Sequence, residues 1–186
     1  MRVLIRTVLT GAVALIAVGA SRPAHAQRIS GTYELALCRT APCVPGDTVA
    51  AYFTATVVLL DSATAAAQSV LPRARYEREP ANGCFRVRHY QRLADSYAGI
   101  VKASSFTWQP LGESPGTIAF RLYRSPDASY RVRTTVIGDR LTGSGTSDGV
   151  GAAEMHAPRD TVVAVRVAEA DVARCGDLSR RPGRRL

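Results

Sequence analysis

The sequence predicts an all-β fold, a single antiparallel β-barrel of about eight strands, with a β-sandwich as the alternative. Two observations predict it: apolar and polar residues alternate with a period of two in run after run, and turn residues separate these runs. Only Ser62–Leu71 suits a helix, and Pro72 ends it. A barrel is favoured because it leaves no open sheet edge. A chain of 186 residues that is 46% hydrophobic suits one folded domain and excludes a disordered protein.

Two strands are expected before residue 61. The first covers residues 32–37, where Tyr33 begins the apolar face. The second falls within Thr48–Leu60, with Phe53 on its apolar face. Because neighbouring residues in a strand point to opposite faces, Tyr52 is expected on the other face from Phe53.

The remaining strands follow two turn signals. Asn82-Gly83 precedes a strand in which His89 falls on the apolar face beside Phe85, and Gly138-Asp139 predicts a hairpin. The polar alternates of the strands, many of them Arg, are expected to face water. Further strands are expected in residues 97–103, 105–109, 118–123, 130–136, 140–145 and 163–167.

The first 26 residues have the three parts of a secretory signal peptide. Arg2 and Arg6 precede an apolar run of 13 residues from Val8 to Ala20, and Ala24-His25-Ala26 fits a cleavage site before Gln27. That run is shorter than the roughly 20 residues that a membrane-spanning helix needs. We therefore expect a periplasmic or secreted protein. Its expected parts are the signal peptide 1–26, a barrel domain 27–178 and a basic disordered tail 179–186.

All four cysteines follow the signal peptide, and an even number in an oxidising compartment predicts two disulfides. Three pairings are possible. We favour Cys38–Cys43, which would close a short loop, and Cys84–Cys175, which would fasten the C-terminal segment to the domain. The chain has no C-x-x-C spacing, so we expect no zinc or other metal site, and nothing in the sequence predicts a cofactor.

Gly31-Thr32-Tyr33 on the first strand resembles the G-x-W motif that opens the lipocalins and the wider calycin barrels, with Tyr in the Trp position. The later motifs of that family and its long helix after the last strand have no counterpart here. The resemblance implies a barrel with a ligand cavity, and a disulfide from a mid-barrel strand to the C-terminal segment that Cys84–Cys175 matches. Candidate ligand-binding residues are Tyr33, Phe53, Phe85, His89, Trp108 and Phe120.

Two features bear on catalysis. Gly145–Gly149 fits the G-x-S-x-G pattern, with Ser147 as the candidate nucleophile, but that pattern works where a strand turns into a helix. The glycine-rich flanks indicate a flexible loop instead. Glu154 and His156 share a face of an extended segment and are candidates for an acid–base pair, which we interpret as part of a solvent-exposed loop. We therefore favour a protein without catalytic activity.

The net charge of +9 lies mostly at the ends of the chain. Removing residues 1–26 leaves +6, and leaving out the tail after residue 178 as well gives +2. A nearly neutral body argues against nucleic-acid binding. Arginine rows at residues 86–92 and 131–133 are interpreted as ordinary mixed surface. Because one face of most strands carries Arg, we also expect that the barrel is not embedded in a membrane.

The function expected from these observations is binding of a small apolar or amphipathic molecule inside the barrel. The alternative is a structural or interaction module of the cell envelope, with the basic tail on an anionic envelope component. A hydrolase ranks below both. If Phe53, Phe85, Phe120 and Leu122 fill the interior completely and leave no cavity, the ligand-binding interpretation fails.

Overall fold

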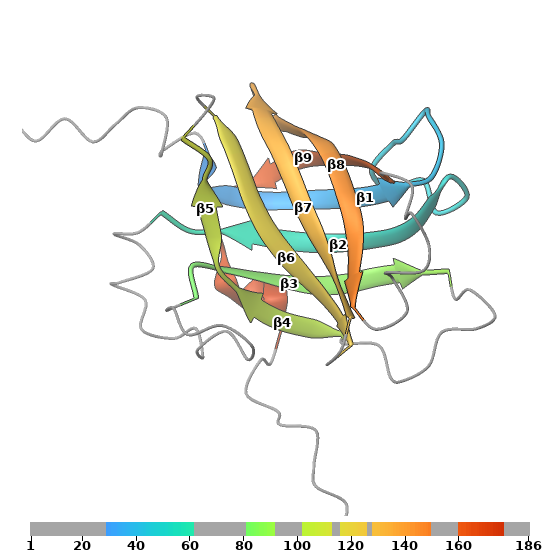
Figure 1. Cartoon of the computed structure of the whole chain (residues 1–186). Helices are drawn as coiled ribbons and strands as arrows, with labels where there is room; N and C mark the ends of the chain where they lie inside the picture. Colours follow the sequence, from blue (N-terminus) through green and yellow to red (C-terminus); the bar gives the residue numbers. More distant parts are fainter. Residues whose placement is uncertain are drawn as a thin grey trace, which may run out of the picture.

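The structure, a computed structural model, describes residues 29–61, 81–91, 102–112, 116–125, 128–149 and 160–176. These residues form one nearly closed antiparallel β-barrel of nine strands, which confirms the predicted fold class (Figure 1). The signal-peptide and tail predictions concern residues outside the described ranges. The strands are β1 (Gly31–Cys38), β2 (Ala51–Leu59), β3 (Gly83–Tyr90), β4 (Ala103–Phe106), β5 (Trp108–Pro110), β6 (Thr117–Ser125), β7 (Ala128–Ile137), β8 (Arg140–Gly149) and β9 (Asp160–Ala168).

The strands follow the order β4-β3-β2-β1-β9-β8-β7-β6-β5 around the barrel, with every neighbouring pair antiparallel. The first strand therefore pairs with the last. In Figure 1, β6, β7 and β8 run across β1, β2 and β3, so the barrel has two crossing walls. The Gly138-Asp139 turn joins β7 to β8, as the sequence predicts, and Gly138 adopts a left-handed conformation with φ of 60°.

One extended segment joins the two edges of this sheet. The sequence predicted one strand over residues 105–109, and the structure divides this stretch at Thr107 between β4 and β5. On one side of this break, β4 pairs with β3, and on the other β5 pairs with β6. The rings of Phe106 on β4 and Phe120 on β6 stack at 5.3 Å between centroids and fill the join from the inside. The segment closes the barrel by changing its partner at Thr107.

A clasp between Asn82 and Trp108 holds this segment in place. The backbone N–H of Trp108 donates to Asn82 Oδ1 at 2.7 Å, and Asn82 Nδ2 donates to the Trp108 carbonyl at 2.9 Å. The indole N–H of Trp108 donates to the carbonyl oxygens of Leu60 and Asn82 at 3.0 and 3.1 Å. The sequence suggested a turn at Asn82-Gly83. Instead, Gly83 begins β3, where a Cβ atom would lie 2.6 Å from the Phe106 ring.

The interior holds one contiguous cluster of buried side chains, to which all nine strands contribute. Tyr33, Phe53, Phe85, Trp108 and Phe120, all candidates from the sequence, belong to it and are each at most 7% exposed. Leu122 is fully buried in the same cluster. These side chains are therefore packed against one another in the middle of the barrel, which argues against a ligand at its centre.

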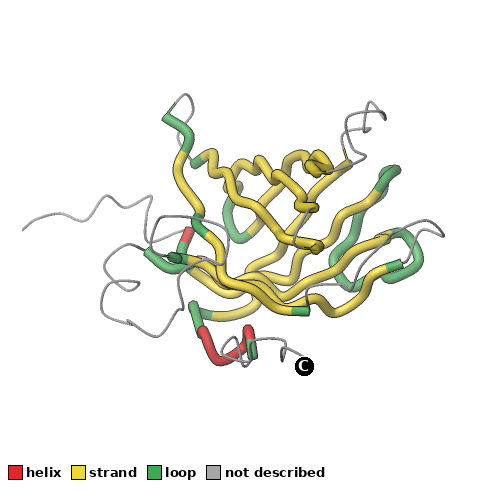
Figure 2. Tube along the Cα trace, turned by 60° about the horizontal axis from the view of Figure 1, so that its bottom comes forward, coloured by secondary structure: helices red, strands yellow, loops and turns green. Residues whose placement is uncertain are grey.

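A smaller core lies outside the barrel. The 3-10 helix η1 (Val172–Cys175) covers the outer face of β2 and β3, where Val58, Leu60 and Cys84 pack with Cys175 (Figure 2). Both disulfides that the sequence favoured are present, Cys38–Cys43 and Cys84–Cys175, with Cα–Cα distances of 5.6 and 6.0 Å. The C-terminal segment is thus fastened to the middle of the chain.

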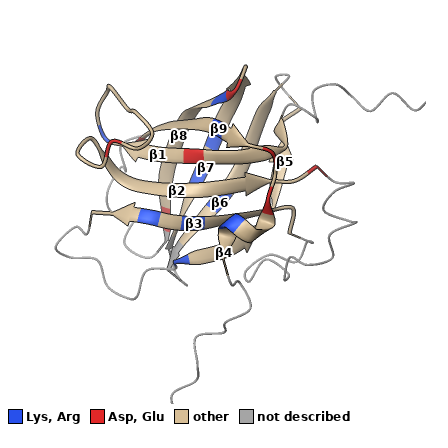
Figure 3. Ribbon diagram, turned by 180° about the vertical axis from the view of Figure 1, so that it is seen from behind, with Lys and Arg blue, Asp and Glu red and all other residues tan. Residues whose placement is uncertain are grey.

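The outer face of β2 departs from the prediction that polar alternates face water. Thr56 is fully buried there, accepting a hydrogen bond from Arg88 Nε at 2.9 Å and donating to Glu34 at 3.0 Å. Seen from behind, acidic colour on β1 and basic colour on β3 flank the uncharged β2 (Figure 3).

On the other wall the polar alternates do face water, as predicted. The side chain of Arg131 is 59% exposed, and its Nη2 lies 2.8 Å from Asp148 Oδ2. The arginines of β3 and β7 lie on strands that are far apart in the sheet order, so they form no common basic face.

We expect removal of the long-range disulfide to cost far more stability than removal of the short one. The Cys84–Cys175 link spans 91 residues and the Cys38–Cys43 link spans 5. In the chain-entropy description, these links lower the free energy of the folded state relative to the unfolded state by about 4–5 and about 2 kcal/mol. Urea denaturation of the Cys84→Ala/Cys175→Ala and Cys38→Ala/Cys43→Ala variants measures both. Equal losses would contradict this role of the C-terminal link.

Asn82→Ala is expected to lower the free energy of unfolding by about 2–4 kcal/mol, because it removes two hydrogen bonds and leaves the backbone groups of Trp108 unsatisfied. The measurement is chemical denaturation followed by the fluorescence of Trp108, the one tryptophan in the chain. Gln109→Ala, at the next and exposed position of β5, serves as the control and should change stability little. A similar small change in both variants would show that the clasp does not hold the segment.

Candidate functional site

The most polar part of the barrel interior lies where β2, β7 and β9 begin. A β-bulge produces it: Leu37 of β1 pairs with Phe53, and Cys38 pairs with Ala51, so Tyr52 is an extra residue in β2. The bulge brings the side chains of both Tyr52 and Phe53 into the core, and their rings lie 6.1 and 5.6 Å from that of Tyr130. The sequence prediction that Tyr52 faces outward is therefore wrong.

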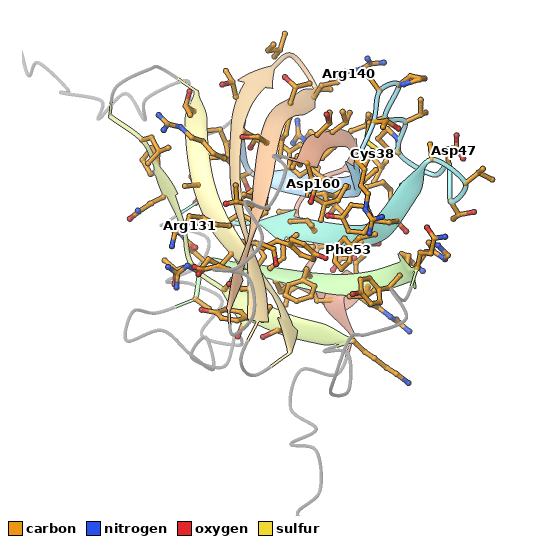
Figure 4. All side chains as sticks on the ribbon, turned by 45° about the vertical axis from the view of Figure 1, so that its right-hand side comes forward. Cys38, Asp47, Phe53, Arg131, Arg140 and Asp160 are labelled. Atoms are coloured by element: carbon orange, nitrogen blue, oxygen red, sulfur yellow. A yellow bond between two sulfur atoms is a disulfide. The ribbon has the colours of Figure 1, made fainter. Side chains whose placement is uncertain are left out.

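Asp160 is a buried carboxylate beside Tyr52. It begins β9, it is 8% exposed, and its Oδ2 accepts a hydrogen bond from the hydroxyl of Tyr52. The two residues are 108 positions apart in the sequence. Figure 4 looks towards this part of the barrel and labels Asp160, Phe53 and Cys38 there, with Arg131 on the other wall. Burial of a carboxylate among aromatic rings is costly unless polar partners compensate for the lost water.

Burial raises the pKa of Asp160, whereas the hydrogen bond from Tyr52 and the charge of Arg39 act in the opposite direction. Burial also raises the pKa of the Tyr52 hydroxyl, and Tyr130 and Asp160 raise it further. Tyr52 is therefore a neutral donor at any physiological pH. The pair can present a carboxylate oxygen and a hydroxyl from inside the barrel wall.

Arg39 brings a positive charge to the same place. Its guanidinium carbon lies 5.3 Å from the centre of the Tyr52 ring, the arrangement of a cation–π contact. Arg39 follows Cys38 directly and is exposed, within a loop that the Cys38–Cys43 disulfide closes. The guanidinium thus covers the outer side of the Tyr52 ring.

Tyr90 at the end of β3 completes the group. Its ring packs edge-on against Phe53 at 6.2 Å, and its hydroxyl is buried with no hydrogen-bond partner among the residues that the structure describes. An unsatisfied buried hydroxyl is costly and marks a place where a polar atom could bind. We call this group the tyrosine end of the barrel; it consists of Arg39, Tyr52, Phe53, Tyr90, Tyr130 and Asp160.

A second bulge corrects the prediction for His89. Thr54 pairs with His89 and Ala55 pairs with Val87, so Arg88 is the extra residue in β3. Directly paired residues share a face, and Thr54 lies on the outer face of β2, so His89 lies outside. Its place on the inner face is taken by Tyr90, which packs against the core. His89 therefore does not line the interior as predicted.

The G-x-S-x-G segment is part of a strand and was wrongly expected as a flexible loop. Residues 140–149 pair with β7 along their whole length, and residues 140–145 pair with β9 as well. A Cβ atom at Gly145 would lie 3.0 Å from the Leu37 side chain, so a larger residue there would require that side chain to shift. Ser147 pairs with Tyr130, so it shares that residue's inner face near the tyrosine end. Within the described residues around it, Ser147 lies inside β8 and no helix is present.

The other catalytic candidates, Glu154 and His156, lie outside the described residues. Within the described residues, no group of three or more His, Cys, Asp or Glu side chains is placed to hold a metal ion. In the same part of the chain, no helix is long and apolar enough to span a membrane. The structure thus brings Phe53 and Ser147, of the predicted site residues, to the tyrosine end.

No protein-family model matches this chain, and neither a curated protein nor a solved structure is significantly similar to it. The likeness to lipocalins is therefore one of barrel architecture.

Sequence patterns did not reveal Tyr52, Asp160 and Arg39 as a group. The available signal was the pair of large aromatic residues Tyr52-Phe53 within one strand. Two neighbouring aromatic side chains can both be buried on one face only if the strand contains a bulge.

The raised pKa of Asp160 predicts a pH dependence of stability. The folded protein holds this proton more tightly than the unfolded chain, in which the carboxyl has its ordinary pKa of 3.8. The stabilisation is complete below that pH and is lost as the pH rises through the folded-state pKa. Asp160→Asn removes this titration and keeps an oxygen that can accept from Tyr52.

We therefore expect the free energy of unfolding of the wild type, minus that of Asp160→Asn, to fall as the pH is raised from about 3 to about 7. Urea denaturation at a series of pH values measures this difference. The other carboxylates are common to both proteins and cancel in the subtraction. A difference that rises with pH would show that the folded protein stabilises the charged form of Asp160.

Proposed function

We propose that this protein is an exported, lipocalin-like binding protein that holds a small amphipathic molecule at the tyrosine end of its barrel, without catalysis. The observation that carries the proposal is the difference between the two ends of the interior. At one end the Asn82–Trp108 clasp pairs the polar groups with one another. At the other, a carboxylate, a hydroxyl that has no hydrogen-bond partner among the described residues and several aromatic rings lie together.

The tyrosine end supplies what a small amphipathic ligand needs. Aromatic rings bury large apolar areas, and a few placed polar groups fix the orientation of the ligand. Here Tyr52, Tyr130 and Phe53 offer the apolar surface, and Asp160 and Tyr90 offer the polar atoms. The ligand contacts this end rather than the packed centre of the barrel.

Export is part of the same proposal. It is supported by the signal-peptide pattern in residues 1–26 and by the two disulfides, which are compatible with an oxidising compartment outside the cytoplasm. The alternative, an envelope module that uses its basic tail, depends on residues 179–186, outside the described part of the chain. A hydrolase finds no support, because Ser147 lies within a strand.

Native mass spectrometry of the protein isolated from its own source is expected to show the oxidised polypeptide with an added small-molecule mass. Tyr130→Leu keeps an apolar side chain but removes the ring and hydroxyl, so it should lose that mass. Ile137→Ala, 64% exposed beside the β7–β8 turn, is the control and should retain it. A wild-type mass equal to the bare polypeptide, in gently isolated protein, would exclude the proposal.

A further inference from the structure

The arrangement of Arg39 suggests what kind of polar group the ligand carries. The guanidinium lies against the face of Tyr52, which is where a cation is attracted by the ring, and its charge opposes the rise that burial causes in the pKa of the nearby Asp160 carboxyl. Arg39 belongs to the exposed loop and does not form part of the core. Its side chain can leave the ring by rotation about its own bonds, without unpacking the barrel.

We propose that the tyrosine end binds an organic cation with an alkylated ammonium group, which replaces the Arg39 guanidinium over the Tyr52 ring and has Asp160 as its counter-ion. This inference rests on the proposed function and names the ligand class. Arg39 then acts as an internal substitute that covers the site while it is empty.

The chemistry of the site favours this class over the other charged ligands. An anion would meet the Asp160 carboxylate in a poorly solvated place and be repelled. A metal ion would need several hard ligands, and no such group of three exists among the described side chains. An alkylated ammonium ion is weakly hydrated, its alkyl groups pack on aromatic rings, and its charge suits both the ring faces and the carboxylate.

The remaining members of the tyrosine end fit the same occupant. Tyr130 and Phe53 continue the aromatic surface from Tyr52, with ring centroids 6.1 and 5.6 Å apart in successive pairs. Beyond Phe53, the hydroxyl of Tyr90, which has no partner within the described part of the chain, can bond to a hydroxyl or carbonyl group elsewhere on the ligand. A cation with a short polar chain would thus satisfy both the buried carboxylate and this hydroxyl.

The test uses three probes on the purified oxidised protein: tetramethylammonium, choline and neohexanol, the neutral compound that has the shape of choline. Isothermal titration calorimetry should show that choline and tetramethylammonium bind and that neohexanol binds about tenfold more weakly or not at all. Equal binding of choline and neohexanol would overturn the proposal, because the charge would then contribute nothing.

Two variants test the roles of the charged residues. Arg39→Ala removes the internal competitor and should tighten choline binding by about tenfold, whereas Asp160→Asn removes the counter-ion and should weaken it by at least about tenfold. Arg140→Ala, exposed at the β7–β8 turn, is the matched control for the loss of one arginine and should leave the affinity unchanged. Unchanged or weaker binding in Arg39→Ala would overturn the proposal.

Near-ultraviolet circular dichroism establishes that each variant is folded. If Asp160→Asn does not fold, Arg39→Ala decides the outcome, because an exposed side chain on a disulfide-closed loop can be truncated without loss of the core. The two proposals fail in different ways. A retained native ligand that is neutral or anionic overturns the cation inference and leaves the proposed function standing, whereas absence of both a native ligand and cation binding overturns both.

Discussion

The structure depends on one segment, residues 103–110, that pairs with both edges of the same sheet. Without the change of partner at Thr107, β3 and β6 would be open edges with unpaired backbone groups. Closure in turn creates an enclosed core, since Phe106 and Phe120 meet only when these edges are brought together. At one end of the barrel, the polar groups of Asn82 and Trp108 bond to each other and hold the closing segment in place. At the other end, the buried carboxylate of Asp160 takes no part in closure.

The period-two alternation predicted the barrel because side-chain direction in a strand is a local property. A strand that packs one face against an enclosed core buries every second residue, and the interior positions of β1 and β7 follow this alternation. The disulfide pairing could also be predicted, because a short loop and a link to the C-terminal segment were the simplest use of four cysteines. Local pattern was thus enough for the architecture.

The candidate site could not be predicted in the same way, because two bulges decide it. At each bulge one strand has an extra residue relative to its partner, and everything beyond it changes face. Tyr52 moves inside and His89 moves outside for this reason. The position of a bulge depends on how a strand pairs with its neighbour, so the residues of a single strand do not reveal it. The contact between Asp160 and Tyr52 could not be predicted, because it forms only when β9 is in place.

A buried carboxylate beside a tyrosine gives a less stable folded state than an apolar residue at that position would. An apolar residue at position 160 would pack against the rings without the cost of removing a charge from water. Groups of this kind, with shifted pKa values, concentrate at functional sites, although structural networks also contain them. Tyr90 carries a similar cost, because its buried hydroxyl has no hydrogen-bond partner among the described residues.

The pairing of β1 with β9 sets a condition on how the chain can be made. Polypeptides are synthesised from the N-terminus onward. The pairing of β1 with β9 must therefore wait for residues 160–168, and Cys84 must wait for Cys175. The barrel cannot close before these residues are present. Until then the apolar faces of the earlier strands are incompletely buried, which favours aggregation of the unfinished chain.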